Sequence, residues 1–529
     1  MGQTAAARLL MQGTFGATMA QINAAAAQSY DAWFSAQAAL TATHEMPMVP
    51  DWNSNREAPW WTIAVTAQDQ LRQRMAFALS QILVVSAVNA SLQYQSQALA
   101  RYYDQIVDNA LGNYRNLLDV VSHSPVMAQY LTFFQNQAPN ATTGTHADEN
   151  YAREIMQLFT VGLWKLNPDG TQQLTSVGSP IATYGQPEVT ALARVFTGWA
   201  SAPQNGQTGN NAWLYSDDLL DPLACYANYH DTNPKTIIGG VVIAAGGTCQ
   251  SDMEAALDAL FNHPNVGPFL SKQLIQRLVT SNPSSGYVGR VAAVFADNGS
   301  GIRGDLLAVA KAILTDPEAA TPGTAATAGK LREPVLRVTN LWRSFSAIDA
   351  NGKIEDPITL NAQADFQEDS LLSPTVFNFY QPSYVRAGPL SVAGLVSPEF
   401  EITNEFTLVQ SANDVESLAY FYTTSAGTKC AGADGYVVST SGTTVFLQTA
   451  ALEADAASPA TLVNDLNLML MGGQMPAAMQ SALVSYIGTI PLAPVSCYGS
   501  NSFGGSGPAM RVIEATELII NSPQYAIQL

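Results

Sequence analysis

The sequence predicts a mainly α-helical fold, a large multi-helix body with a few short β-hairpins and loop insertions. Most segments place apolar residues three and four positions apart, as one face of a helix requires; residues 69–87 do so with Leu71, Met75, Leu79 and Ile82. Strand-like runs are few, short and isolated, and no repeat of fixed period occurs. A chain of 529 residues is long enough to bury a substantial core.

The first predicted part is an N-terminal helical region, residues 1–199. Helices are expected through residue 137, with a break at Pro125 because proline cannot continue a helix from the preceding turn. A helix with a polar arc follows, beginning near Asp148. Residues 167–170 then read Asn-Pro-Asp-Gly, which is turn chemistry between two extended runs and predicts a hairpin.

Three further parts complete the predicted organisation. Residues 200–250 form a loop and strand insertion, with a strand at 235–243 and a probable disulfide. Residues 251–400 form a second helical part that ends in an aromatic, proline-bearing loop. Residues 401–529 hold C-terminal helices around a section rich in Gly, Ser and Thr.

Composition restricts the partners. Charged residues make up only 12 % of the chain and the net charge is −19, so we expect neither nucleic acid nor an anionic membrane surface as a partner. The absence of an apolar run of 18 residues predicts no integral membrane span. Residues 1–16 lack the basic and apolar regions of a signal peptide, and we interpret this start as that of a mature or trimmed chain.

The cysteines are four, an even number, and lie in loop-like stretches. Their spacing fits no zinc motif, so two disulfides are the favoured interpretation and an oxidising compartment the favoured location. Four cysteines allow three connectivities. The simplest is Cys225 with Cys249 and Cys430 with Cys497; four unpaired, buried thiols are the alternative.

The densest polar cluster lies in the stretch HADENYAREIMQLFTVGLWKLNPDGT, residues 146–171. On a helix its polar members share one arc and its apolar members the other. Either the arc is a solvated surface with a Glu149–Arg153 pair, or it lines a cleft in which Arg153 is more than half buried. The cleft hypothesis assigns catalysis to Glu154 and Glu149, and ligand binding to Arg153, Asn150 and Gln157.

A cleft needs partners from other helices, because one helix cannot surround a ligand. The available basic residues are Lys272, Arg277 and Arg337, to which we assign ligand binding, and the acidic ones are Glu368 and Asp369. Such a pocket would suit a carboxylate, phosphate or sulfate. The alternative is a structural network of buried ion pairs, including Glu333–Arg337.

Other motifs point to no known chemistry. The five histidines include no zinc-binding spacing, and His230 beside Asp231 is the best candidate in a loop. Residues 295–306 lack the spacing of a calcium loop and predict a helix junction capped by Asp305. Neither a nucleophile elbow nor a nucleotide-binding glycine pattern occurs. We therefore expect no metal site, and the residues indicate no cofactor.

The aromatic loop FQEDSLLSPTVFNFYQPSY, residues 366–384, allows two interpretations. Carboxylates followed by aromatic rings can line a carbohydrate groove, with the rings stacked on sugar faces and Glu368 and Asp369 as acid and base. Equally, the loop can cover the helical core, which we favour.

Several long stretches resemble one bacterial family. They are DQLRQRMAFALSQILVVS, DENYAREIMQLFTVGLWKLNPDGT, VTALARVFTGW, the run from HPNVGPFL to LTDPEA, and SLLSPTVFNFYQPSY. In this order they resemble the domain of unknown function 1800 family over essentially the whole chain. The resemblance implies export, to the periplasm or outside the cell, and a co-encoded exported sulfatase-like protein as a partner. It transfers neither an activity nor a site residue.

Two classes of function follow. One is an extracytoplasmic enzyme acting on a glycan or other polar polymer. The other is a non-catalytic envelope protein for binding or assembly, partnering the sulfatase-like protein. The oligomeric state is not indicated.

Overall fold

The computed structural model describes residues 1–321, 323, 328–349, 351–354, 366–420, 445–493 and 507–529. Helices dominate it, and the strands described are two residues long and paired in antiparallel twos, which confirms the predicted mainly α fold. One continuous apolar core extends from Ala6 to Tyr525. Among the described residues, no helix is both long and apolar enough to cross a bilayer.

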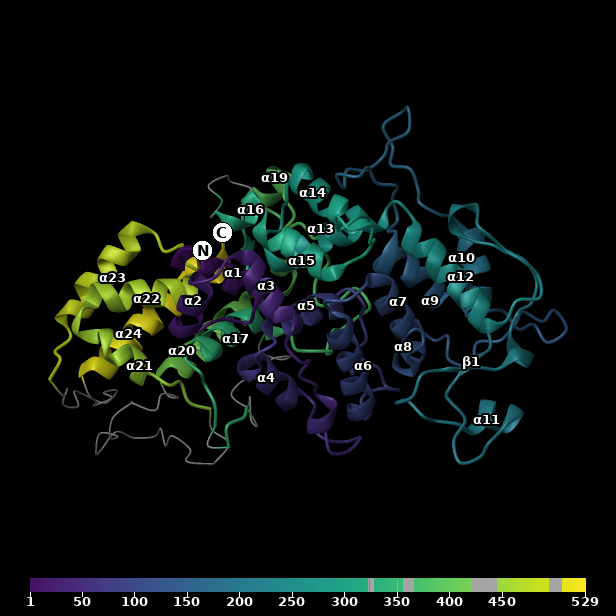
Figure 1. Ribbon diagram of the computed structural model, residues 1–529, viewed down its shortest axis with the longest axis horizontal. Helices are drawn as coiled ribbons and strands as arrows, with labels where there is room; N and C mark the ends of the chain where they lie inside the picture. The colour runs from purple at the N-terminus through teal and green to yellow at the C-terminus, as the bar shows by residue number, and fades with distance from the viewer. Residues whose placement is uncertain (322, 324–327, 350, 355–365, 421–444, 494–506) are drawn as a thin grey trace.

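The N-terminal region supplies the centre of the molecule (Figure 1). Its elements are α1 (Gln3–Gly13), α2 (Met19–Ala26), α3 (Tyr30–Ala38), η1 (Met46–Met48), α4 (Glu57–Thr66), α5 (Gln70–Ser80), α6 (Ser96–Asn109), α7 (Tyr114–Ser122), α8 (Pro125–Tyr130), α9 (Asn150–Glu154) and the π-helical turn η2 (Ile155–Thr160). Pro125 begins α8, as the break after α7 predicts. The helix predicted over residues 69–87 ends earlier, at Ser80.

The predicted insertion forms a lobe at the right of Figure 1. It lies between α10 (Gln186–Val195) and α12 (Cys249–Asn262), and contains β1 (Trp199–Ala200), α11 (Gly209–Tyr215), β2 (Ala224–Cys225), η3 (Ala227–Tyr229), β3 (Lys235–Thr236), η4 (Ile238–Gly240) and β4 (Val242–Ile243). The single strand predicted at 235–243 is wrong. Gly239 and Gly240 both have positive φ, so the segment folds back and β3 pairs with β4.

A second group of helices packs on the first. It consists of α13 (Val266–Leu278), α14 (Ser285–Ala296), α15 (Leu306–Thr315), α16 (Pro317–Ala320), β5 (Lys330–Leu331), α17 (Pro334–Ser344), α19 (Pro389–Val392) and η5 (Pro398–Ile402). Asp305 caps α15 by accepting the N–H of Ala308 at 3.0 Å, as the sequence predicts. α17 lies against α4, where Trp342 and Trp61 meet edge to face.

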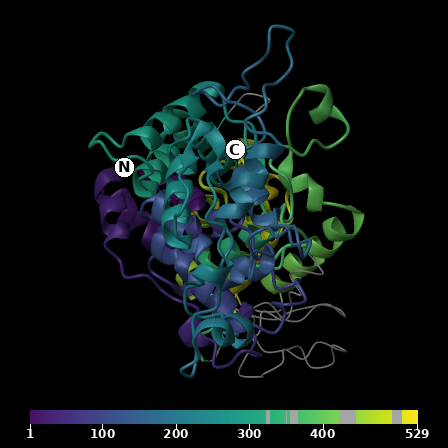
Figure 2. The ribbon, with the colours of Figure 1, turned by 90° about the vertical axis from the view of Figure 1, so that its right-hand side faces the viewer.

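The C-terminal helices lie at the left of Figure 1 and pack on α1 and α2. They are α20 (Glu405–Tyr420), α21 (Ala450–Glu453), η6 (Asp455–Ala457), α22 (Pro459–Met471), α23 (Ala477–Thr489), α24 (Gly507–Ile520), α25 (Pro523–Ala526) and the closing strand β6 (Ile527–Gln528), which pairs with β5. From the side, the green segment containing α19 and α20 lies opposite the purple first helices (Figure 2).

Candidate functional site

A solvent-open pocket of about 420 Å³ lies between α13, the π-helical turn η2, the hairpin after it and the aromatic loop. We call it the glutamine pocket, because six glutamines line it: Gln81, Gln157, Gln172, Gln273, Gln276 and Gln381. Its volume lies within the roughly 300–1,000 Å³ typical of small-molecule sites.

One wall is a face of α13. Phe269, Lys272, Gln273 and Gln276 are three or four positions apart, so they project from the same side of that helix, and Arg277 closes the floor. Gln276 also donates from Nε2 to the carbonyl of Pro382 at 3.0 Å. This bond fixes the aromatic loop, which is the opposite wall, relative to α13.

The second wall is η2 and two successive hairpins of residues 164–182, which project at the top of Figure 1. Buried Asn265, at the start of α13, donates to the carbonyls of Val161 and Trp164, both at 2.8 Å, and accepts from the N–H of Leu166 at 3.0 Å. A side chain that satisfies three backbone groups holds this segment in place without regular secondary structure.

Gly162 makes the turn from η2 into the hairpins. Its φ is +70°, and a Cβ there would lie 2.7 Å from the ring of Phe269. Only glycine satisfies both the left-handed backbone and the close ring. The turn brings Trp164 to the mouth, where it is 40 % exposed, while Phe269 lies inside the pocket.

Beneath the pocket lies a group of buried charges, here named the inner ion cluster: Arg74, Arg277, Lys330, Glu333, Glu368 and Glu399. Lys330 Nζ lies 3.0 Å from Glu333 Oε1 and 3.1 Å from Glu399 Oε1, and donates to the carbonyl of Arg277 at 2.8 Å. The Arg277 guanidinium donates to the carbonyl of Gln81 at 2.9 Å. Arg277 therefore belongs both to the cluster and to the pocket floor, and Gln81 of the floor is bonded to the cluster.

The two carboxyls nearest Gln81 differ in protonation. Burial alone would raise the pKa of Glu333, but Lys330 and Arg74 outweigh burial and lower it to about 2. Burial, and next the neighbouring Glu333, raise the pKa of Glu368 well above its ordinary value. Gln81 Nε2 donates to Glu333 Oε2 at 2.7 Å and lies 3.5 Å from Glu368 Oε1. Glu333 is thus the anion and Glu368 favours its neutral form.

The structure brings together three of the predicted site residues, Gln157, Lys272 and Arg277, in the glutamine pocket. Gln157 faces it from η2. Lys272 lies exposed at the rim, where desolvation by the surrounding protein still lowers its pKa, and it makes neither a hydrogen bond nor an ion pair with a described residue.

The other members of the polar arc lie elsewhere. The arc is not one α-helix, since α9 gives way to the π-helical turn after Glu154. Glu149 is the N-cap residue of α9, and Asp148, near which the sequence placed the start of the helix, accepts the N–H of Asn150 at 2.8 Å. Asn150 lies exposed beside Thr132.

The Arg153 side chain is 41 % exposed, hence more than half buried as predicted, and it pairs with Glu149 at 3.2 Å, outside the glutamine pocket. Burial would raise the pKa of Glu149, but hydrogen bonds from Thr190 and Gln186, and then Arg153, lower it. The Glu149 carboxylate thus connects α9 to α10 through hydrogen bonds from two side chains of α10.

Glu154 is different. It is only 6 % exposed, its Oε2 has no hydrogen-bond partner among the described residues, and burial raises its pKa. It lies one turn before Gln157 and Leu158, which line the pocket, but does not itself line it. Its catalytic role, like that of Glu149, stays a prediction.

The remaining basic and acidic candidates do not line the pocket. Arg337 lies outside the pocket, with its Nε buried and its pKa lowered by burial. The expected Glu333–Arg337 pair is wrong, because Glu333 pairs with Lys330 instead. Glu368 and Asp369 are buried members of the aromatic loop, which covers the core as we favoured, and Phe377 and Gln381 of the same loop line the pocket.

The lobe has its own buried charges. His230 Nε2 lies 3.2 Å from Asp252 Oδ2, and Lys235 Nζ lies 2.6 Å from the same oxygen. Asp231 receives two hydrogen bonds from Arg194 of α10. These contacts bind the lobe to α10 and α12, and they account for the His230–Asp231 pair without chemistry.

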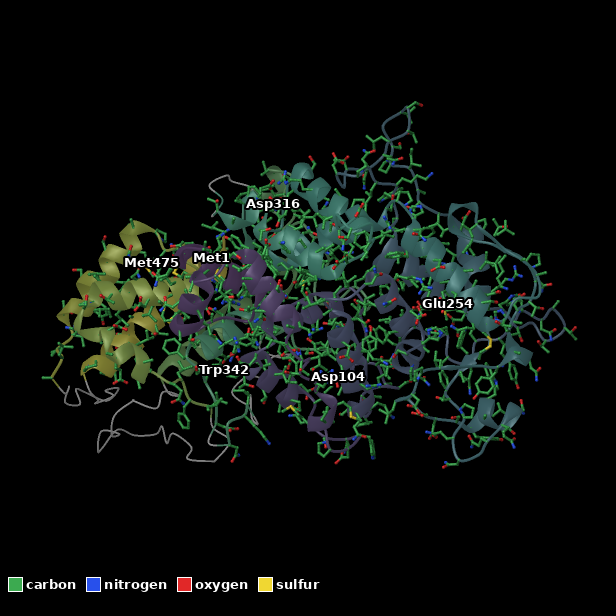
Figure 3. The ribbon with its side chains drawn as sticks, viewed as in Figure 1. Met1, Asp104, Glu254, Asp316, Trp342 and Met475 are labelled. Atoms are coloured by element: carbon green, nitrogen blue, oxygen red, sulfur yellow. A yellow bond between two sulfur atoms is a disulfide. The ribbon has the colours of Figure 1, made fainter. Side chains whose placement is uncertain are left out.

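Cys225 and Cys249 form the predicted disulfide, which joins β2 to α12 and is the yellow sulfur–sulfur bond at the right of Figure 3. Cys430 and Cys497 lie outside the described residues. Within the described part of the chain, no three His, Cys, Asp or Glu residues gather as ligands for a metal ion.

Sequence reasoning missed most of the pocket, above all five of its six glutamines, and it missed Asn265 and Lys330, which support the hairpin wall and the floor. A signal was present on α13, where Lys272, Gln273 and Gln276 interrupt an apolar helix on one side. The other walls come from segments up to about 300 positions apart, and no local pattern joins them.

Fold and site together define a mainly α-helical protein with an amide- and aromatic-lined pocket above a buried ion cluster. The chain belongs to the family described as "Protein of unknown function (DUF1800)", whose model matches residues 8–527. Comparisons with curated proteins and with solved structures return no match.

Proposed function

We propose that this is an exported protein that binds a segment of a glycan or another polar polymer in the glutamine pocket. The observation that carries the proposal is the pocket's lining. Aromatic rings, Trp164, Phe269 and Phe377, stand beside amide side chains, which both donate and accept hydrogen bonds. Sugars present the same combination, with apolar faces for rings and hydroxyls for amides.

The lining favours binding over hydrolysis. Most glycosidases need two carboxyl groups beside the scissile bond. The residues that line the pocket within the described part of the chain include neither Asp nor Glu. The aromatic loop thus contributes rings to the pocket but not the acid and base that its Glu368 and Asp369 could have supplied.

Export is supported by the disulfide. Cys225–Cys249 closes a loop between residues 24 positions apart, and such bonds persist mainly in oxidising compartments. A periplasmic or extracellular location also fits a polymer ligand.

The test is retention of the protein by polysaccharides. Wild type, W164A and the control W52A are run through native gels that contain a panel of neutral and acidic polysaccharides. Trp52 is 59 % exposed and outside the pocket, so W52A removes an indole that is at least as accessible as that of Trp164. We expect at least one polysaccharide to retard wild type and W52A but not W164A. No retardation by any polymer, or equal retardation of W164A, would refute the proposal.

A hydrolase is the second candidate, and Glu154 is the observation that favours it. A buried carboxyl with a raised pKa and a free oxygen is suited to donate a proton. The experiment is release of reducing ends from a retained polysaccharide by wild type and E154Q. Loss of release with unchanged melting temperature would assign the general acid to Glu154, whereas no release by wild type leaves binding alone.

Assembly with a co-encoded exported sulfatase-like protein remains the other proposal. The projecting hairpins carry exposed Leu174 and Val177, the latter 84 % exposed, which suit a protein contact. Co-purification from the native host, with wild type and with L174S/V177S, tests it: the sulfatase-like protein should be recovered only with wild type.

A further inference from the structure

We infer that the ligand segment in the glutamine pocket carries an oxyanion, a carboxylate or a sulfate or phosphate ester, which binds on α13 at Lys272 and Gln273. This deepens the proposed function and rests on it. Three features of the pocket support it: an unpaired cation, unpartnered buried donors and the positive charge below them.

Lys272 is the cation. It stands on the pocket face of α13, one turn before Gln276, and makes neither a hydrogen bond nor an ion pair with any described residue. In contrast, Lys330, Lys311 and Lys235 each pair with a carboxylate. In a chain with few charges, an ammonium in a pocket free of described carboxylates is available to a ligand.

Two buried donors lie beside it. Gln273 is 9 % exposed and Arg277 3 % exposed, and Gln273 Nε2 and Arg277 Nε have no partner among the described residues. A buried N–H group without an acceptor costs free energy, about 1–3 kcal/mol. Both residues line the pocket, so a side-chain rotation that turns these N–H groups toward it would let a bound oxyanion supply the missing acceptors.

The inner ion cluster adds to the positive potential. It contains three cations, Arg74, Arg277 and Lys330, against Glu333, Glu399 and Glu368. Because Glu368 favours its neutral form, the cations are in excess directly beneath the floor. Low-dielectric walls strengthen the attraction of such a floor for an anion.

The experiment compares ligands that differ only in charge. The probes are an oligogalacturonide hexamer with its fully methyl-esterified form, a sulfated galactan oligosaccharide with its desulfated form, and inorganic phosphate as a competitor. Isothermal titration calorimetry is run on wild type, K272M, K272E and the control K311M. Lys311 is on the surface and pairs with Asp31 outside the pocket, so K311M removes the same charge elsewhere.

We expect one charged member to bind wild type and K311M roughly tenfold more tightly than its neutral partner, since a charge-assisted hydrogen bond supplies that much. K272M should abolish the difference, and K272E should reverse it. The preferred pair separates carboxylate from sulfate, and competition by phosphate at millimolar concentration would show that the site also accepts a phosphate group.

Equal binding of charged and neutral members would overturn the inference and leave the proposed function standing. A preference that survives in K272M and K272E would overturn it too. Absence of binding by all oligosaccharides, together with no gel retardation by any polymer, refutes the proposed function and with it the inference. Melting curves keep the variants interpretable, because Lys272 is exposed and bonded to nothing described.

Discussion

Single residues in this protein matter most where charge is buried. Lys330 is the clearest case, because one ammonium at the centre of the inner ion cluster lies within ion-pair distance of both Glu333 and Glu399 and also donates to the Arg277 carbonyl. A buried charge that loses its partner keeps its desolvation cost. Removing one member of such a pair is therefore strongly destabilising.

We therefore predict that Lys330→Met lowers the free energy of unfolding by about 3–5 kcal/mol. Lys311→Met, which breaks a surface pair with Asp31, should cost less than about 1 kcal/mol. Urea denaturation followed by circular dichroism measures both. If the two variants lose the same small amount, the inner ion cluster does not carry the stability argued for it.

Asp369 gives a prediction about pH. Burial, and next Glu57, raise its pKa from 3.8 to about 7 in the folded protein. Between about pH 4 and 7 the unfolded chain has lost this proton while the folded chain keeps it. The free energy of unfolding should then fall by up to about 1.4 kcal/mol per pH unit as pH rises.

Asp369→Asn removes that proton, so the difference in stability between variant and wild type should grow in favour of the variant from pH 4 to 7. Urea unfolding at four pH values in this range measures it. Parallel curves for the two proteins would show that Asp369 is ionised in the folded state.

At the scale of elements, side-chain hydrogen bonds, ion pairs and one disulfide hold in place the segments that lack long helices or strands. Asn265 holds the hairpin wall by three backbone groups, and Gln276 holds the aromatic loop. The lobe is tied by the Asp231–Arg194 contact, by the Lys235–Asp252 pair and by one disulfide. Each tie is local, so its loss should loosen one element first.

The disulfide allows this to be tested. Replacing Cys225 and Cys249 together by serine should cost about 3 kcal/mol on the loop-entropy account for a separation of 24 residues. Because the bond closes the lobe, limited proteolysis should begin between residues 200 and 248 in the variant. Cleavage that begins elsewhere, at the wild-type rate, would show that the buried ion pairs suffice without the bond.

At the scale of the whole molecule, residues 523–529 connect the C-terminal helices to α17 and to the end of α13. The Tyr525 hydroxyl donates to the carbonyl of Arg337 at 2.6 Å and its ring lies 4.7 Å from the Arg332 guanidinium carbon. Gln528 Nε2 donates to the carbonyls of Leu278 and Val279, at the end of the pocket helix α13.

Removing residues 523–529 should thus destabilise the protein by more than about 4 kcal/mol, because a buried ring is lost and Arg332 keeps its charge without its aromatic partner. Removing Leu529 alone, which is 36 % exposed, is the control and should cost little. Thermal unfolding measures both; similar melting temperatures for the two truncations would contradict the closing role of Tyr525 and Gln528.

The sequence by itself determined what depends on neighbours along the chain. Apolar spacing predicted the helical class, Pro125 the break between α7 and α8, Asp305 a helix cap, and the Asn-Pro-Asp-Gly turn a hairpin. Local chemistry also suggested Cys225–Cys249, because the two thiols flank one loop. Lys272, Arg277 and Gln157 were identified as charges and amides that an apolar context makes conspicuous.

Only the tertiary structure decided which of these residues share a site. Gln157 lines the pocket, whereas Glu149 and Arg153, one to two turns earlier, bond to α10 instead. Lys330, not Arg337, became the partner of Glu333, since a buried carboxylate pairs with whichever cation the fold brings within reach. Pocket walls and buried ion pairs join segments hundreds of positions apart, and such contacts follow from how whole helices pack and not from any pattern within one of them.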